Sequence, residues 1–68
     1  MRKGESVTVK SVSGNGISCP LIDIDKVNKK IWVRFPTGQA IEMNWDDKRK
    51  LYVGRMARIE FTVASVQI

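Results

Sequence analysis

The sequence predicts an all-β fold, a small five-stranded antiparallel barrel with one short helix before the last strand. Apolar and polar residues alternate with a period of two along most of the chain, which is typical of strands with one face inward and one face in water. Gly, Pro, Asn and Asp, which favour tight turns, separate the alternating segments. The chain has only 68 residues, and closing the sheet hides its edges and gives a thin set of apolar side chains a common interior.

The first two strands are expected at residues 6–10 and 17–24. Valines alternate with polar residues in the first of them. Residues 13–16, Ser-Gly-Asn-Gly, tolerate the positive φ that a reversal between paired strands needs. Pro20 lacks a donor for the ladder, so the second strand is expected to lie at an edge or to carry a bulge there. An edge leaves pairing with a second copy of the chain open.

The next two strands are expected at residues 30–35 and 40–45, after a second turn at 25–29. Alternation is strictest in the first of these strands. Pro36 presets φ at the second position of a reversal, and Gly38 follows where a left-handed residue is needed. A tight hairpin is therefore expected to join the two strands.

One or two helical turns are expected over residues 45–53. Asn44 can serve as the N-cap, and Gly54 can end the helix. Asp46 and Asp47 then lie in the first turn and three basic residues lie toward the end, which suits the helix dipole.

The last strand is expected at residues 57–63, where the alternation returns. Val66 and Ile68 are out of phase with it, which indicates a bulge near residues 64–65 or a frayed end. The residues expected to face the common interior are Val7, Val9, Ile17, Leu21, Ile31, Val33, Ile41, Met43, Ile59 and Phe61.

Residues 1–68 are expected to form one domain with no catalytic activity and no cofactor. A domain of this size buries only ~60% of its unfolded surface, which leaves little room for an enzyme cleft. The chain has no His and a single Cys19, expected in the core, so a disulfide within the chain and the usual zinc ligand sets are excluded. We find no signal-peptide pattern and no apolar stretch near the ~20 residues of a membrane span, so a cytoplasmic location away from membranes is expected.

Three segments in the second half of the chain share the pattern of a known family. Residues 31–39 contain a strand that ends in a Gly turn, and residues 46–49 are acidic and then basic. In residues 52–61, Gly and a basic residue begin a strand of alternating apolar residues. In these segments the chain resembles the OB-fold domain of ATP-dependent DNA ligases. The Lys-x-Asp-Gly motif of ligases is absent. The resemblance therefore implies a non-catalytic barrel whose basic surface holds a DNA backbone. The alternation of apolar and polar residues does not reveal the order of the strands in the barrel, so the sequence does not decide between an OB-like and an SH3-like fold.

The excess of Lys and Arg over Asp and Glu indicates a partner that carries phosphate groups. The formal net charge is +5, and a field of this sign attracts polyanions. If Ile31 and Val33 point inward, Trp32 lies outside between two cations, where it can stack a base; the alternative is a Trp that covers a second small core. The residues expected to bind nucleic acid are Lys30, Trp32, Arg34, Lys48, Arg49, Arg55 and Arg58.

We therefore expect a nucleic-acid-binding module, with DNA favoured over RNA. A second interpretation is an SH3-like module that binds a partner peptide with Trp32 and Tyr52, in which the charge serves solubility and steering. Asp23 and Asp25 share a face and can bridge Mg²⁺. Paired turn acids more often cap backbone donors, so no metal is expected.

Overall fold

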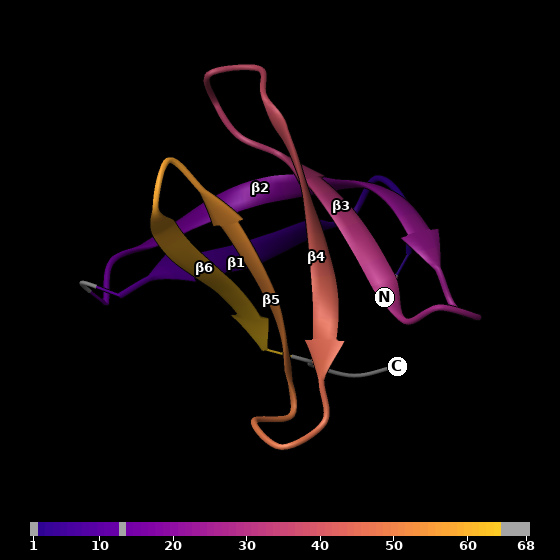
Figure 1. Cartoon of the computed structure of the whole chain (residues 1–68). Helices are drawn as coiled ribbons and strands as arrows, with labels where there is room; N and C mark the ends of the chain where they lie inside the picture. The colour runs from indigo at the N-terminus through magenta and orange to yellow at the C-terminus, as the bar shows by residue number, and fades with distance from the viewer. Residues whose placement is uncertain (1, 13, 65–68) are drawn as a thin grey trace.

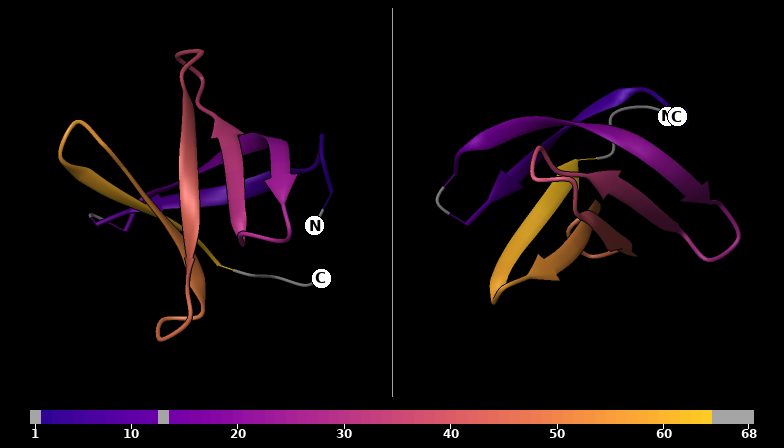
Figure 2. Two further views of the ribbon diagram at one scale, coloured as in Figure 1. Left: turned by 45° about the vertical axis from the view of Figure 1, so that its right-hand side comes forward. Right: turned by 90° about the horizontal axis from the view of Figure 1, so that it is seen from above.

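The computed structural model describes residues 2–12 and 14–64 and shows a closed antiparallel β-barrel (Figures 1 and 2). The all-β barrel that the sequence predicts is thus confirmed. The described residues contain no helix, and hence none long and apolar enough to cross a membrane. The six strands are β1 (Ser6–Ser11), β2 (Gly16–Asp25), β3 (Lys30–Arg34), β4 (Ala40–Asp46), β5 (Leu51–Met56) and β6 (Ile59–Ala64).

The strands follow one another around the barrel in sequence order, and β1 pairs with β6 to close it. In the closing pair Lys10 lies opposite Thr62 and Ser11 lies opposite Phe61. This is the up-and-down order, whereas an OB fold is a Greek-key barrel. Because consecutive strands run in opposite directions, the turns after β2 and β4 lie at one end of the barrel and the other turns at the opposite end. Figure 1 shows the turns after β3 and β5 at the top and the turn after β4 at the bottom.

The prediction of a helix over residues 45–53 is wrong, because this segment forms the β4–β5 hairpin. β4 continues to Asp46, whose Oδ1 accepts the N–H groups of Lys48 and Arg49 at 3.0 and 3.2 Å. The N–H of Lys50 donates to the Asp46 carbonyl at 2.7 Å, and Lys50 itself has a φ of 58°. An Asp caps such a turn with the same hydrogen bonds that cap a helix. The apolar and β-branched run that follows favours a strand.

Residues 51–64 form two strands where one was predicted, so the count of five strands is also wrong. β5 and β6 are joined by Ala57 and Arg58, whose φ angles are 53° and 68°. Met56 pairs with Ile59 across them. Two positive φ angles in a two-residue loop define a type I′ turn, for which Asn and Gly are the favoured residues. Ala57 and Arg58 are not residues that favour a type I′ turn, so the sequence does not predict this turn.

β2 pairs on both sides, so the edge that was one of the two expectations near Pro20 is not formed. The N–H of Leu21 donates to the carbonyl of Glu5 at 2.8 Å. Successive N–H groups of a strand point to opposite sides, so the Pro20 nitrogen faces the β3 side of β2. The ladder between β2 and β3 begins only at Leu21, so no ladder hydrogen bond is lost at Pro20. The other expectation, a bulge, is met two residues further on at Ile22, where the register to β3 shifts between Leu21 and Asp23.

The core consists of apolar side chains from the inward rows of the strands. Of the predicted interior, Ile17 and Ile59 are 41% and 43% exposed, because both lie beside turns at the ends of their strands. Phe61 is half-buried, with its ring 5.0 Å from that of Phe35. Cys19 is buried as predicted, and burial raises the pKa of its thiol. The buried apolar residues are Val7, Val9, Cys19, Leu21, Ile31, Val33, Phe35, Ile41, Met43 and Val63.

The first turn forms as predicted in the residues that the structure describes. Gly14 has a φ of 90°, and its N–H donates to the Ser11 carbonyl at 2.9 Å. Ser13 of this turn lies outside the described residues, and so does the bulge or frayed end predicted from Val66 and Ile68.

Gly54, predicted to end a helix, is instead buried within β5, where a side chain has no room. A Cβ there would lie 2.8 Å from the Glu42 carbonyl oxygen and 2.9 Å from Met43 Cγ. We expect Gly54→Ala to lower the free energy of unfolding in urea by ~1–3 kcal/mol, as overpacking does. Gly16→Ala is the control, because the nearest atom to its Cβ is on the exposed side chain of Thr8, at 3.0 Å. Equal stability of the two variants would contradict the close approach of β5 to β4.

The β5–β6 turn is strained, because a left-handed conformation costs a residue other than Gly ~1–2 kcal/mol. We expect the double change Ala57→Asn and Arg58→Gly to raise the free energy of unfolding by ~1–2 kcal/mol and the thermal midpoint by ~4–8 °C per kcal/mol. Thermal unfolding followed by circular dichroism measures this, with Arg58→Gln as the control for loss of charge. An unchanged or lower midpoint in the double variant would show that the turn is not of type I′.

Candidate nucleic-acid interface

Trp32 lies on the outer face of β3 and is half-buried rather than exposed. Its partners in register are Asp23 on β2 and Glu42 on β4. Lys30 and Arg34 lie two residues away on the same face of β3. The indole is thus surrounded by two cations and two carboxylates, and a phosphate backbone laid across it meets the like charges of Asp23 and Glu42.

The two cations beside Trp32 already interact with other groups. Lys30 Nζ lies 3.4 Å from Glu42 Oε2. Arg34 Nη1 donates to the carbonyl of Gly38 at 2.8 Å, which fastens the β3–β4 turn. Exposed contacts of this kind contribute ~0–1 kcal/mol, so a phosphate can displace them. The outer face of β3 nevertheless offers less excess positive charge than the alternation predicts.

Glu60 on β6 attracts two further cations of the predicted site. Its Oε1 lies 3.2 Å from both Nη1 and Nη2 of Arg49. Arg55 lies opposite Glu60 in the register of β5 and β6. Both arginines therefore have a carboxylate beside them, which lowers their attraction for a phosphate.

The seven predicted residues do not form one surface. Lys30 and Arg34 are separated by four residues of one strand, a distance of about 13 Å. In the same way, the length of β5 separates the β4–β5 turn, which holds Lys48, from the β5–β6 turn, which holds Arg58. Lys30 and Lys48 lie at the end of the barrel that holds the turns after β2 and β4, whereas Arg34, Arg55 and Arg58 lie toward the other end, with Trp32 between them. Arg49 comes from the first of these ends, but its guanidinium reaches Glu60 on β6.

The end formed by residues 26–30 and 47–50, which we call the basic turn end, is the most basic part of the barrel. The N–H of Trp45 in β4 donates to the carbonyl of Lys29 at 3.0 Å, which continues the β3–β4 pairing to the edge of the first of these turns. Lys26, Lys29 and Lys50 were not among the seven predicted residues. Lys50 was left out because three consecutive cations on the expected helix cannot share one face. Half of the chain's twelve basic residues belong to these two segments, with the Arg49 guanidinium turned toward Glu60: Lys26, Lys29, Lys30, Lys48, Arg49 and Lys50.

Two acids of this region cap backbone donors of their own turns. Asp25 Oδ1 accepts the N–H groups of Val27 and Asn28, both at 3.1 Å, and its Oδ2 accepts the Asn28 side-chain amide at 2.8 Å. The hydrogen bond from the Asn28 side chain is the largest cause of the lowered pKa of Asp25. Asp46 caps the next turn in the same way. Asp23 and Asp25 share an outward face, but the described residues contain no group of three metal ligands.

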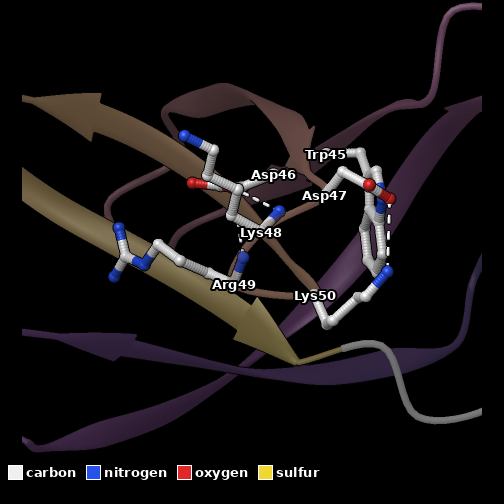
Figure 3. A network of polar contacts seen from close by, with 6 residues as sticks. All are labelled: Trp45, Asp46, Asp47, Lys48, Arg49 and Lys50. Atoms are coloured by element: carbon white, nitrogen blue, oxygen red, sulfur yellow. Dashed lines mark hydrogen bonds and ion pairs between the residues drawn. The ribbon is translucent and has the colours of Figure 1, made fainter.

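Asp47 differs from these capping acids, because side chains hold it (Figure 3). Its Oδ1 lies 3.4 Å from Trp45 Nε1 and 3.4 Å from Lys50 Nζ. The hydrogen bond from Trp45, followed by the hydrogen bond and charge of Lys50 and the charge of Lys29, lowers the pKa of Asp47. The Trp45 ring packs edge-on against Tyr52 with the ring centroids 5.0 Å apart, and both residues are half-buried.

Trp32 and Tyr52, the two aromatic residues of the peptide-binding interpretation, lie on opposite faces of the sheet. Trp32 is in register with Glu42, whereas Tyr52 is in register with Trp45. These two partners are an odd number of residues apart on β4, and side chains alternate between faces. Trp32 and Tyr52 therefore do not line one groove.

Comparisons of the chain with protein-family models, with curated proteins and with solved structures found no match. The function is therefore inferred from the geometry and charge of the barrel itself.

Proposed function

We propose that this protein is a non-catalytic nucleic-acid-binding barrel that contacts phosphates with its basic turn end. The observation that carries the proposal is the strand order of the barrel, because it brings the turns after β2 and β4, with half of the basic residues of the chain, to the same end. Phosphate contacts by Lys and Arg supply most of the sequence-independent affinity for nucleic acid. The preference for DNA over RNA rests on the resemblance of three sequence segments to ligase OB-fold domains, whose Greek-key strand order this barrel does not share.

The backbone conformation of two lysines supports this proposal. Lys29 and Lys50 have φ angles of 55° and 58°, a region that Gly or Asn adopts with less strain. Residues in such conformations cluster at functional sites, although Ala57 and Arg58 at the opposite end adopt them as well. An exposed lysine at such a position adds positive charge that a glycine would not, which is consistent with a role in binding an anion.

The orientation of the nearby acids also supports it. The carboxylates of Asp25 and Asp46 accept hydrogen bonds from the backbone of their own turns. Lys26, Lys29 and Lys48 are exposed, and none of them forms an ion pair with a described residue. Phosphate groups can therefore approach these three lysines without first breaking a salt bridge.

We assign no stacking role to Trp32 in this proposal. Its half-burial limits the face that it can offer to a base, and Asp23 and Glu42 flank it in register. The binding mode that we propose therefore depends on charge and has weak sequence preference.

The proposal predicts that charge matters at one end of the barrel only. Lys29→Gln with Lys48→Gln should lower the affinity for a fluorescein-labelled single-stranded dT oligonucleotide roughly tenfold at low salt. Loss of two contacts should also reduce the slope of log K against log salt by ~1.4, at ~0.7 per phosphate. Fluorescence anisotropy over a salt series measures both, and a matched RNA oligonucleotide tests the preference for DNA.

The matched control removes two charges from the opposite end, with Arg34→Gln and Arg58→Gln. It has the same net charge as the test variant, so the general field of the protein weakens equally in both. Equal losses in the two variants would contradict a site at the basic turn end. Absence of binding by the unaltered protein at low salt would reject the proposed function.

A further inference from the structure

The position of Asp47 is unusual within the basic turn end, because its carboxylate lies among the basic residues to which the proposed function assigns the binding of phosphate. Its carboxylate lies within 3.4 Å of two donors, the indole Nε1 of Trp45 and Nζ of Lys50 (Figure 3). The positive charge of Lys29, whose backbone carbonyl accepts from the N–H of Trp45, also acts on the group. One carboxylate thus contacts a lysine and an indole N–H, with a second lysine charge nearby.

The turn does not need this carboxylate. Asp46 alone accepts from the N–H groups of Lys48, Arg49 and Lys50 with its side chain and carbonyl, which closes the β4–β5 turn. The hydrogen bonds that Asp47 makes within the described part of the chain both go to side chains. Its own side chain is 80% exposed. The backbone of the turn therefore does not depend on Asp47.

We propose that Trp45 Nε1, Lys50 and Lys29 form a phosphate-binding site for a single-stranded nucleic acid, and that the Asp47 carboxylate occupies this site as an internal competitor. This inference rests on the proposed function and adds the position of one phosphodiester group. Carboxylates and phosphates accept the same charge-assisted hydrogen bonds from lysine and other N–H donors. An incoming phosphate replaces Asp47 at these donors, and the carboxylate turns to water.

The contacts of Asp47 are suited to such an exchange. Both are long for charge-assisted hydrogen bonds, which are usually ~2.7–2.9 Å. Exposed ion pairs of this kind contribute little to stability. The donors are better fixed than the acceptor, because the Trp45 ring packs against Tyr52 and its backbone is bonded to Lys29. The lowered pKa of Asp47 is consistent with a site that favours a negative charge.

The first test is the affinity of Asp47→Asn for a single-stranded dT oligonucleotide. Removal of the competing charge should tighten binding roughly 3–10-fold, because like charges at an interface oppose association. Asp23→Asn is the matched control, since it makes the same change of net charge on the outer face of the sheet, where Asp23 lies 3.7 Å from Lys3. It should tighten binding by less than about twofold, because salt screens distant charges.

The second test follows the indole N–H directly in Trp32→Phe protein, in which Trp45 gives the one remaining indole signal in a ¹H–¹⁵N spectrum. The oligonucleotide should shift this signal, and so should sodium tripolyphosphate at constant ionic strength. Half-saturation should come at lower concentration when Asp47→Asn is added. Tripolyphosphate tests the site for free phosphate groups, and the oligonucleotide tests it for phosphodiesters.

The outcomes separate this inference from the proposed function. If the oligonucleotide binds but Asp47→Asn behaves like Asp23→Asn and the Trp45 signal stays in place, the site is wrong and the proposed function stands. If tripolyphosphate shifts the signal and no oligonucleotide binds to any variant, the site takes free polyphosphate and both proposals are rejected as stated.

Discussion

The pairing of β1 with β6 is the interaction on which the rest of the structure depends. It joins the first strand to the last through Lys10 with Thr62 and Ser11 with Phe61, and it turns a meander of six strands into a closed barrel. Closure gives the inward rows a common interior without exposing a strand edge. The antiparallel order of consecutive strands then decides which turns share an end, because the chain returns alternately to the two ends of the barrel.

The distribution of charge follows from this alternation. The turns after β2 and β4 carry lysine-rich segments, and the up-and-down order brings these two turns to the same end. The acids in them differ in role: Asp25 and Asp46 bind backbone N–H groups, whereas Asp47 is held by Trp45 and Lys50. A charge balance that is modest over the whole chain therefore becomes a local excess of positive charge at one end.

The strands with clear alternation could be predicted from the sequence, and so could the turns marked by Gly or Pro. The helix prediction failed because Asp46 followed by basic residues caps a tight turn as well as a helix, and pairing with β4 and β6 decides between them. Ala57 and Arg58 show no sign of their turn, since neither favours a positive φ. The site was predicted as a set of cations, but their division between two ends depends on the number and the pairing of the strands, and the helix prediction had removed one strand.

The central claim is that nucleic acid meets the barrel at its basic turn end. Backbone amide signals of ¹⁵N-labelled protein, followed during titration with a single-stranded dT oligonucleotide, test it most directly. The account predicts shifts concentrated in residues 26–30 and 45–50, which weaken as salt is added. Shifts concentrated in residues 32–38 or 55–60, with residues 26–30 unchanged, would contradict it.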